Sequence, residues 1–97
     1  MFDKMKELFE MQKKMKEVKD HLDKTFFDVQ SGDGSLKITM NASQQIKDVL
    51  LLREPSVLRK ENLEAAIKDA VNKGIKRSHD LAAEKMKQVS GLNIPGL

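Results

Sequence analysis

Two groups of basic side chains are the residues of this sequence best suited to contact another molecule. Lysine ammonium groups are flexible point charges that suit phosphate oxygens, and they lack the planar fork with which a side chain reads base edges. These groups therefore predict sequence-independent, salt-sensitive contact with the phosphates of nucleic acid. The candidate DNA-contacting residues are Lys13, Lys14, Lys16, Lys73, Lys76 and Arg77.

The same charges also allow simpler interpretations. Asp69 and Lys73 are four residues apart, and such pairs often do no more than stabilise an exposed helix. A basic helix can also meet an anionic membrane or an acidic protein. Because Phe26 and Phe27 fall in an expected strand, no stacking aromatic accompanies the basic groups, which disfavours single-stranded RNA or DNA as the ligand.

No catalytic, metal or cofactor site is expected. The chain has no cysteine, and His21 and His79 lack the spacing of metal ligands. The segment Gly32-Asp33-Gly34 joins two expected strands instead of opening a helix, so it does not read as a phosphate-binding loop. No pair of carboxylates stands out as a desolvated acid and base. We therefore expect no enzymatic activity, no cofactor and no small-molecule substrate.

The composition indicates one small domain with a thin core. The 97 residues are 39% hydrophobic and 4% aromatic, with no Trp or Tyr and a net charge of +3. Residues 59–97 hold eight basic and five acidic side chains, so the positive excess lies mainly on the second helical segment. A thin core favours burial of further surface in a dimer. The sequence has neither an apolar run of about 18 residues nor a signal peptide, which predicts a soluble, cytoplasmic protein with no membrane partner.

Two long helices are expected to carry the basic groups, and the first covers residues 1–24. This segment contains no Gly or Pro and many Lys, Glu and Met. Its apolar residues recur at alternating steps of three and four, the seam of a helix that packs along another helix. The methionines near the seam fit either a packed core or an adaptable groove for a partner protein. The seam residues are Leu8, Met11, Met15, Val18 and Leu22.

The second helix is expected over residues 57–90, with its main part starting near Lys60. Its small and aliphatic side chains follow the i, i+3, i+4 rule for one buried face. Gly74 in its middle costs about 1 kcal/mol relative to Ala, which indicates either a close crossing with another element or a tolerated imperfection. Gly91 is a C-cap signal, and residues 91–97 are expected to be a nonhelical tail.

Between the helices, residues 25–53 are expected to form a three-stranded antiparallel meander. Asp33-Gly34 predicts a tight hairpin turn of the primed type. The last strand changes the parity of its apolar residues, which predicts either a bulge or twist near Asp48 or burial of the strand on both faces. The result is an α+β fold with the order α-β-β-β-α, in a single domain of residues 1–97. The apolar positions that alternate along the middle strand are Leu36, Ile38 and Met40.

A series of short segments along nearly the whole chain resembles one protein family. The segments are Met5-Lys6, Met11 to Met15, Lys16-Glu17, Gly32-x-Gly34, Leu36-Lys37-Ile38-Thr39-Met40-Asn41, Leu63-Glu64, Ala70-Val71-Asn72, Glu84-Lys85-Met86 and Pro95-Gly96-Leu97. No single one is specific, but their order and spacing are. Together they resemble the YbaB/EbfC family of bacterial nucleoid-associated proteins.

The resemblance implies a homodimer in which sheets and helices interlock and the long helices project as a tweezer-like pair. It also implies binding of double-stranded DNA, a nucleoid-associated location, an architectural or gene-regulatory role, and no catalysis. The alternative is an adaptor that docks a partner protein on its Met-rich first helix. The residues expected at the dimer interface are Leu8, Met11, Met15, Leu36, Ile38, Met40, Ile67 and Val71.

Overall fold

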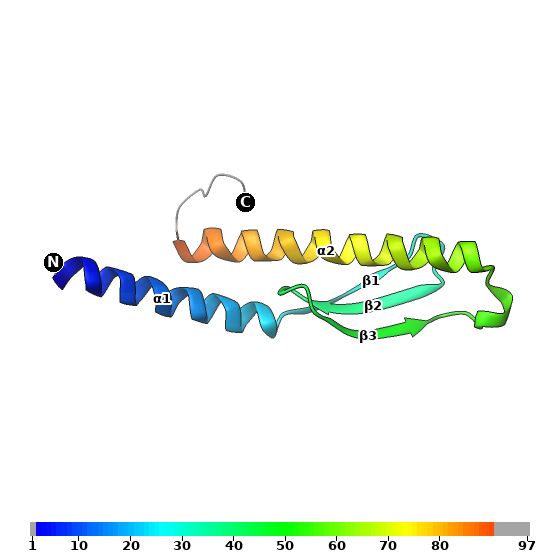
Figure 1. Cartoon of the computed structure of the whole chain (residues 1–97), viewed down its shortest axis with the longest axis horizontal. Helices are drawn as coiled ribbons and strands as arrows, with labels where there is room; N and C mark the ends of the chain where they lie inside the picture. The colour runs from blue at the N-terminus through cyan, green and yellow to red at the C-terminus, as the bar shows by residue number, and fades with distance from the viewer. Residues whose placement is uncertain (1, 91–97) are drawn as a thin grey trace.

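The computed structural model describes residues 2–90 and shows an elongated molecule about 66 Å long (Figure 1). The elements follow the expected α-β-β-β-α order, so the predicted α+β class is confirmed. The expected tail of residues 91–97 lies outside the described residues. The elements are α1 (Phe2–Asp23), β1 (Phe26–Gln30), β2 (Leu36–Asn41), β3 (Ile46–Leu51), a short 3-10 helix (Pro55–Val57) and α2 (Lys60–Ser90).

The core lies between α2 and one face of the sheet. The three strands are antiparallel in the order β1-β2-β3, and β2 in the centre pairs Ile38 with Val29 on one side and Val49 on the other. Because successive strand residues point to opposite faces, one face of β2 is apolar. Its side chains pack under α2 against Ala70, and each is only 1% exposed. They are Leu36, Ile38 and Met40.

The loop between β1 and β2 differs from the predicted primed turn. A type I′ turn needs a positive φ at both central residues, but in this loop Gly34 (φ 76°) has one and Asp33 does not. The amide of Gly34 donates to the carbonyl of Ser31 at 3.0 Å, and the amide of Ser31 donates to the carbonyl of Leu36 at 2.9 Å. The expectation of a two-residue turn was wrong because the Asp33 carboxylate holds a wider loop together.

The predicted irregularity near Asp48 is present. Thr39 pairs with Asp48 while the next residue, Met40, pairs with Ile46, so Lys47 is an extra residue in β3. All six residues of β3 are exposed, including its aliphatic ones, since α2 packs mainly on β2 and β1. The alternative expectation, burial of this strand on both faces, was therefore wrong. The sheet therefore has a covered half and an open half.

Gly74 marks a close crossing, which decides between the two interpretations of this glycine. A Cβ atom at this position would lie 2.7 Å from Cε and 3.2 Å from Sδ of Met40, and 3.5 Å from Cγ2 of Val29. Contacts under 3 Å between such atoms require something to move. The missing side chain therefore lets the backbone of α2 lie directly on the sheet.

The end of α1 is fixed to the sheet by the turn after β2. Asn41 donates from Nδ2 to the carbonyl of Asp23 at 3.2 Å, and the amide of Ala42 donates to the carbonyl of Leu22 at 3.2 Å. Ser43 adds a hydrogen bond from Oγ to the Asp23 carboxylate. Further along the helix, Val18 is only 3% exposed where α1 runs beside α2. These contacts set the direction in which α1 projects.

Candidate nucleic-acid interface

The basic residues of α1 lie on its exposed surface. Val18, the one buried side chain among residues 3–23 of the helix, identifies the side that faces α2. With 3.6 residues per turn, Lys13 and Lys16 lie on the opposite side, whereas Lys14, four residues before Val18, lies on the same side as Val18. All three are exposed. Lys13 and Lys16 therefore offer their ammonium groups to solvent on the side of α1 away from α2, while Lys14 is exposed on the side of Val18.

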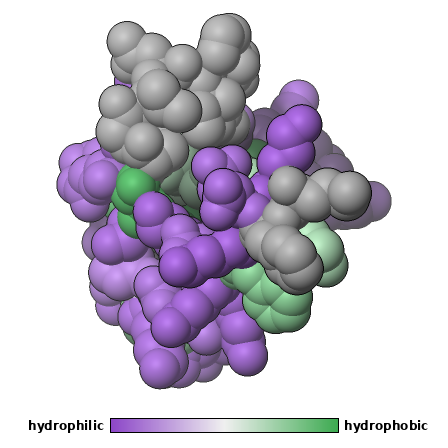
Figure 2. All heavy atoms as spheres, turned by 90° about the vertical axis from the view of Figure 1, so that its left-hand side faces the viewer, coloured by the Kyte–Doolittle hydropathy of each residue, from purple (hydrophilic) through white to green (hydrophobic). Residues whose placement is uncertain are grey.

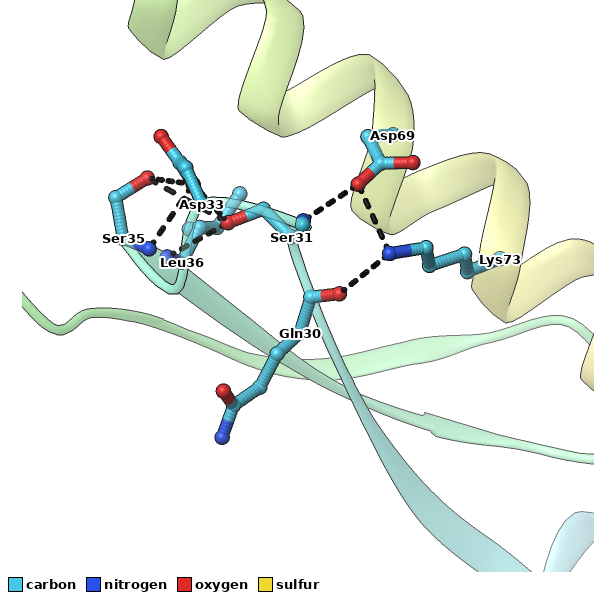
Figure 3. Close-up of polar contacts among 8 residues, drawn as sticks. Gln30, Ser31, Asp33, Ser35, Leu36, Asp69 and Lys73 are labelled. Carbon is cyan, nitrogen blue, oxygen red and sulfur yellow. Dashed lines mark hydrogen bonds and ion pairs between the residues drawn. The ribbon is translucent and has the colours of Figure 1, made fainter.

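Lys73 of α2 also stabilises the fold, through contacts with Asp69 and Gln30 (Figure 3). Its Nζ lies 3.0 Å from Oδ2 of Asp69 and donates to the carbonyl of Gln30 at 3.3 Å. The same Asp69 oxygen accepts a hydrogen bond from the amide of Gly32 at 2.6 Å. We call Asp69 and Lys73 the loop clamp, because together they tie the β1–β2 loop to α2. The ammonium group of Lys73 is thus already engaged by a carboxylate and a carbonyl.

The carboxylates at this loop are held in their ionised form. The hydroxyl of Ser31, followed by the amide and hydroxyl of Ser35, lowers the pKa of Asp33 to about 2. These three groups donate to Oδ1 of Asp33 at 2.7, 3.1 and 2.8 Å. Lys73 and then the amide of Gly32 lower the pKa of Asp69. Hydrogen bonds to a carboxylate favour its charged form, so Asp33 and Asp69 remain ionised at neutral pH.

The remaining basic residues of α2 point outward. Lys76 lies 3.3 Å from Asp80, its neighbour one turn along, and Arg77 is exposed without an ion pair among residues 2–90. Sequence reasoning missed two further polar groups, Lys68 and Asn72. With Ala65 and Lys76 and the two residues of the loop clamp, Asp69 and Lys73, they line an open hollow of about 420 Å³ along α2. The spacing 68, 72, 76 is the i, i+4, i+8 signal that could have found them.

An aromatic side chain does accompany the lysines of α1, contrary to the sequence interpretation. Phe9 is 72% exposed on this helix. It lies outside the apolar seam and outside the strand that holds Phe26 and Phe27, so neither pattern includes it. Its position seven residues before Lys16 was the signal, because residues at i and i+7 share a helix face. This helix therefore carries an exposed aromatic ring that is able to contact bases.

The residues expected at a dimer interface fall into two environments. Those of the middle strand, Leu36, Ile38 and Met40, are covered by α2 of the same chain and are not open to a partner. Val71 is partly buried against the same core. The others are exposed by 40% or more; they are Leu8, Met11, Met15 and Ile67.

Exposed aliphatic side chains lie beside α2 on the open half of the sheet. In the strand pairing, Val49 and Leu51 lie opposite Ile38 and Leu36, so they share the sheet face on which α2 packs. They are 58% and 40% exposed. The loop clamp lies on the β1 flank of α2, and Ile67 lies on the other flank, toward β3. We call this surface the apolar shelf. Its exposed side chains make it a candidate for contact with another protein surface. Its residues are Ile46, Val49, Leu51, Ile67 and Ile75.

Within residues 2–90, the structure offers neither a metal site nor a membrane span. No three His, Cys, Asp or Glu side chains of that range gather where they could hold a metal ion. His21 and His79 are on different helices. No helix in the described part of the chain is long and apolar enough to cross a membrane.

Comparison with known proteins gives one consistent family. The model of the YbaB/EbfC DNA-binding family matches residues 1–92. A nucleoid-associated protein of Dictyoglomus thermophilum is 34% identical over 102 residues, covering 97% of this chain and 92% of the relative. A nucleoid-associated protein of Syntrophobacter fumaroxidans is 31% identical over 100 residues, covering 99% and 89%.

The fold agrees with a solved structure. A crystal structure of an uncharacterized protein from Helicobacter pylori superposes with a TM-score of 0.68 over 88% of this chain and 98% of that one. Its sequence identity of 22% makes this a likeness of fold alone. The match to the family model and the identity of the relatives extend over nearly the whole chain. The chain therefore belongs to the YbaB/EbfC DNA-binding family, which is a family of nucleoid-associated proteins and not of enzymes.

Proposed function

We propose that this protein binds double-stranded DNA as a homodimer, mainly through contacts between basic side chains and phosphates. It acts in the nucleoid, in an architectural or gene-regulatory role, and has no catalytic activity. The family supplies DNA as the partner class. The finer proposals rest on how the two helices present their charges and on the uncovered apolar surface.

The observation that carries the proposal is the solvent-facing basic charge of both long helices. Lys13 and Lys16 face away from α2, while Lys68 and Lys76 face away from the sheet. Lysines at such positions can follow a phosphate backbone without being displaced from packing. Arg77 adds a cation without an ion pair among residues 2–90. Lys73 contributes less, since it must leave the loop clamp to reach a phosphate.

The homodimer is supported by the apolar shelf. Each of the five aliphatic side chains of the shelf is at least 40% exposed, and an exposed apolar patch often marks an interaction site. In a two-fold symmetric pair the same patch meets itself, so the α2 helix of a second copy can lie over β3 of the first. Ile67 would then pack against the partner's sheet. The exposed seam of α1, with Leu8 and Met11, gives the partner helices a second surface on which to interlock.

Binding to duplex DNA is tested by fluorescence anisotropy with a labelled duplex. We expect binding at about 50 mM salt that weakens steeply as salt rises, because phosphate contacts release counterions. Replacing Lys13 and Lys16 by Ala should reduce both the affinity and its salt dependence. Lys60→Ala is the control, because Lys60 is also an exposed lysine but lies at the far end of α2, where it pairs with Glu64 at 3.7 Å. A folded protein that leaves the duplex unbound at low salt would sink the proposal.

The dimer is tested by sedimentation equilibrium. The proposal expects a species of twice the 11.0 kDa chain mass. A mass of one chain at micromolar concentration would contradict it.

A protein-interaction adaptor is the second candidate, because the methionines of α1 are open to solvent. Met5 and Met11 are each 63% exposed and Met15 is 46% exposed. Flexible, polarisable methionine side chains are common on surfaces that accept several partners. A single stoichiometric partner that is recovered after nuclease treatment, and is no longer recovered when Met5 and Met11 are replaced by Ser, would favour this function.

A further inference from the structure

The aromatic ring of Phe9 is exposed among lysines. It lies on the side of α1 opposite Val18, because nine residues make two and a half helical turns. Lys13 and Lys16, four and seven residues further on, share this side with it, as does Lys6 three residues before. The ring of Phe9 therefore does not pack against α2.

The ring forms one wall of an open hollow of about 450 Å³. The other residues that line it are Glu10, Gln12, Lys13 and Lys16. The helix begins well beyond the point where α2 ends, so its first turns project from the body of the molecule (Figure 1). Seen from that end, the surface is mainly hydrophilic, with a hydrophobic patch next to the grey atoms (Figure 2).

We propose that this face of α1 enters the major groove of duplex DNA, where Phe9 contacts the methyl groups of thymines. The proposal rests on the DNA-binding function proposed above and adds a base-reading residue to it. Phosphate contact alone gives an aromatic ring nothing to bind. In the major groove, the thymine methyl group is the apolar feature of the base edges, and phenylalanine is among the side chains that suit it.

The dimensions of the helix fit this groove. An α-helix is about 10–12 Å across with its side chains, and the major groove is about 12 Å wide. From Phe9 to Lys16 the helix rises about 10 Å, which corresponds to about three base pairs. Gln12 lies between them, and its amide can donate to and accept from an adenine edge. Lys13 and Lys16 can then reach the phosphates on either side.

Charge favours DNA over a second copy as the occupant of this face. A second copy would bring Lys6, Lys13 and Lys16 against their own equivalents, and like charges at an interface oppose association. The apolar seam around Leu8 and Met11 lies on another side of the helix and remains available for protein contact. DNA meets both features of the Phe9 face, since its phosphates match the ammonium groups and its thymines match the ring.

Deoxyuridine supplies a clean test, because it lacks only the C5-methyl group of thymidine. Two duplexes of identical sequence, one with dT and one with dU, have the same phosphates and the same hydrogen-bonding edges. We expect the protein to bind the dU duplex about fourfold more weakly for each methyl group contacted, the factor that corresponds to one buried methylene. Phe9→Ala should bind both duplexes equally, with an unchanged salt dependence, and Phe9→Leu should restore part of the preference.

Val57→Ala is the matched control, because Val57 is also 72% exposed but lies in the 3-10 helix at the other end of the molecule. It should keep the full preference for dT. Phe9→Trp gives an independent readout: the chain has no other Trp, and contact with bases should change its fluorescence on the dT duplex more than on the dU duplex.

The outcomes separate this proposal from the one on which it rests. Equal binding of both duplexes by the unmodified protein overturns the role of Phe9 but leaves DNA binding intact. Failure to bind any duplex at low salt removes the proposed function itself. A Phe9→Ala protein that becomes monomeric would place the ring between two copies and overturn the proposal as well.

Discussion

Replacing Gly74 by Ala tests the close contact between α2 and the sheet. In an exposed helix interior this change stabilises by about 1 kcal/mol, because Ala is the better helix former. Here the new methyl group would lie 2.7 Å from Cε of Met40 and 3.2 Å from its Sδ. Cε is the end of a flexible side chain, but Met40 is 1% exposed in the cluster with Leu36, Ile38 and Ala70, so moving it disturbs packed neighbours.

Overpacking of this kind costs about 1–3 kcal/mol. The two effects leave a net loss of about 1 kcal/mol, which lowers the melting temperature of a domain of this size by about 4–8 °C. Thermal unfolding at fixed protein concentration measures it. In a Met40→Val protein, where both contacting atoms are absent, the same Gly74→Ala change should instead stabilise by about 1 kcal/mol.

The decisive result is that Gly74→Ala changes the free energy of unfolding in opposite directions in the unmodified and the Met40→Val protein. It corresponds to a coupling of about 2 kcal/mol between the two positions, well above the error with which independent sites add. If Gly74→Ala stabilised the unmodified protein by the full helix-propensity value, Met40 would not be in contact with α2, and the account of the core would be refuted.

Three further changes test other parts of the fold. Ser78→Ala should raise the free energy of unfolding by about 1 kcal/mol in a urea titration, because its buried Oγ lacks a hydrogen-bond partner in the structure of residues 2–90; a loss would argue against an unsatisfied hydroxyl. The pKa of Asp33, lowered from 3.8 to about 2, means that its stabilisation is complete above about pH 4 and is lost as the pH falls toward 2. The difference in stability between the protein and its Asp33→Asn variant should therefore shrink over that range, and a difference that grows in acid would contradict this. Ile67→Glu should convert the dimer to monomers in sedimentation, while Lys68→Glu on the outer side of α2 should leave it dimeric; two dimeric variants would exclude the apolar shelf as the interface.

The order of elements could be predicted because each carries a clear periodicity. The alternation of Leu36, Ile38 and Met40 fixed which face of the middle strand is buried, and the parity change around Asp48 located the bulge. The loop at Asp33 could not be predicted in the same way. Its conformation depends on hydrogen bonds to the serines on either side and on a clamp from Asp69, which lies far away in the sequence.

The candidate site was only partly predictable for a related reason. Spacing located the basic residues, but it could not show that Lys73 is bound to the carbonyl of Gln30, a contact between residues 43 positions apart. Periodicity also assigned the apolar strand residues to an interface, because it cannot tell whether α2 of the same chain or a partner covers them. Phe9 was overlooked because a seam of aliphatic residues beside it gave the stronger pattern.

The salt dependence of duplex binding tests the central claim most directly. The affinity of the unmodified protein and of the Lys13→Ala, Lys16→Ala double variant would be measured between about 50 and 200 mM salt, a range over which binding through phosphates weakens most strongly. Log affinity falls as log salt rises, and we predict that this fall is less steep in the variant, by about 1 unit of slope for each phosphate that the protein no longer touches. An identical slope for the two proteins would show that these lysines do not hold DNA.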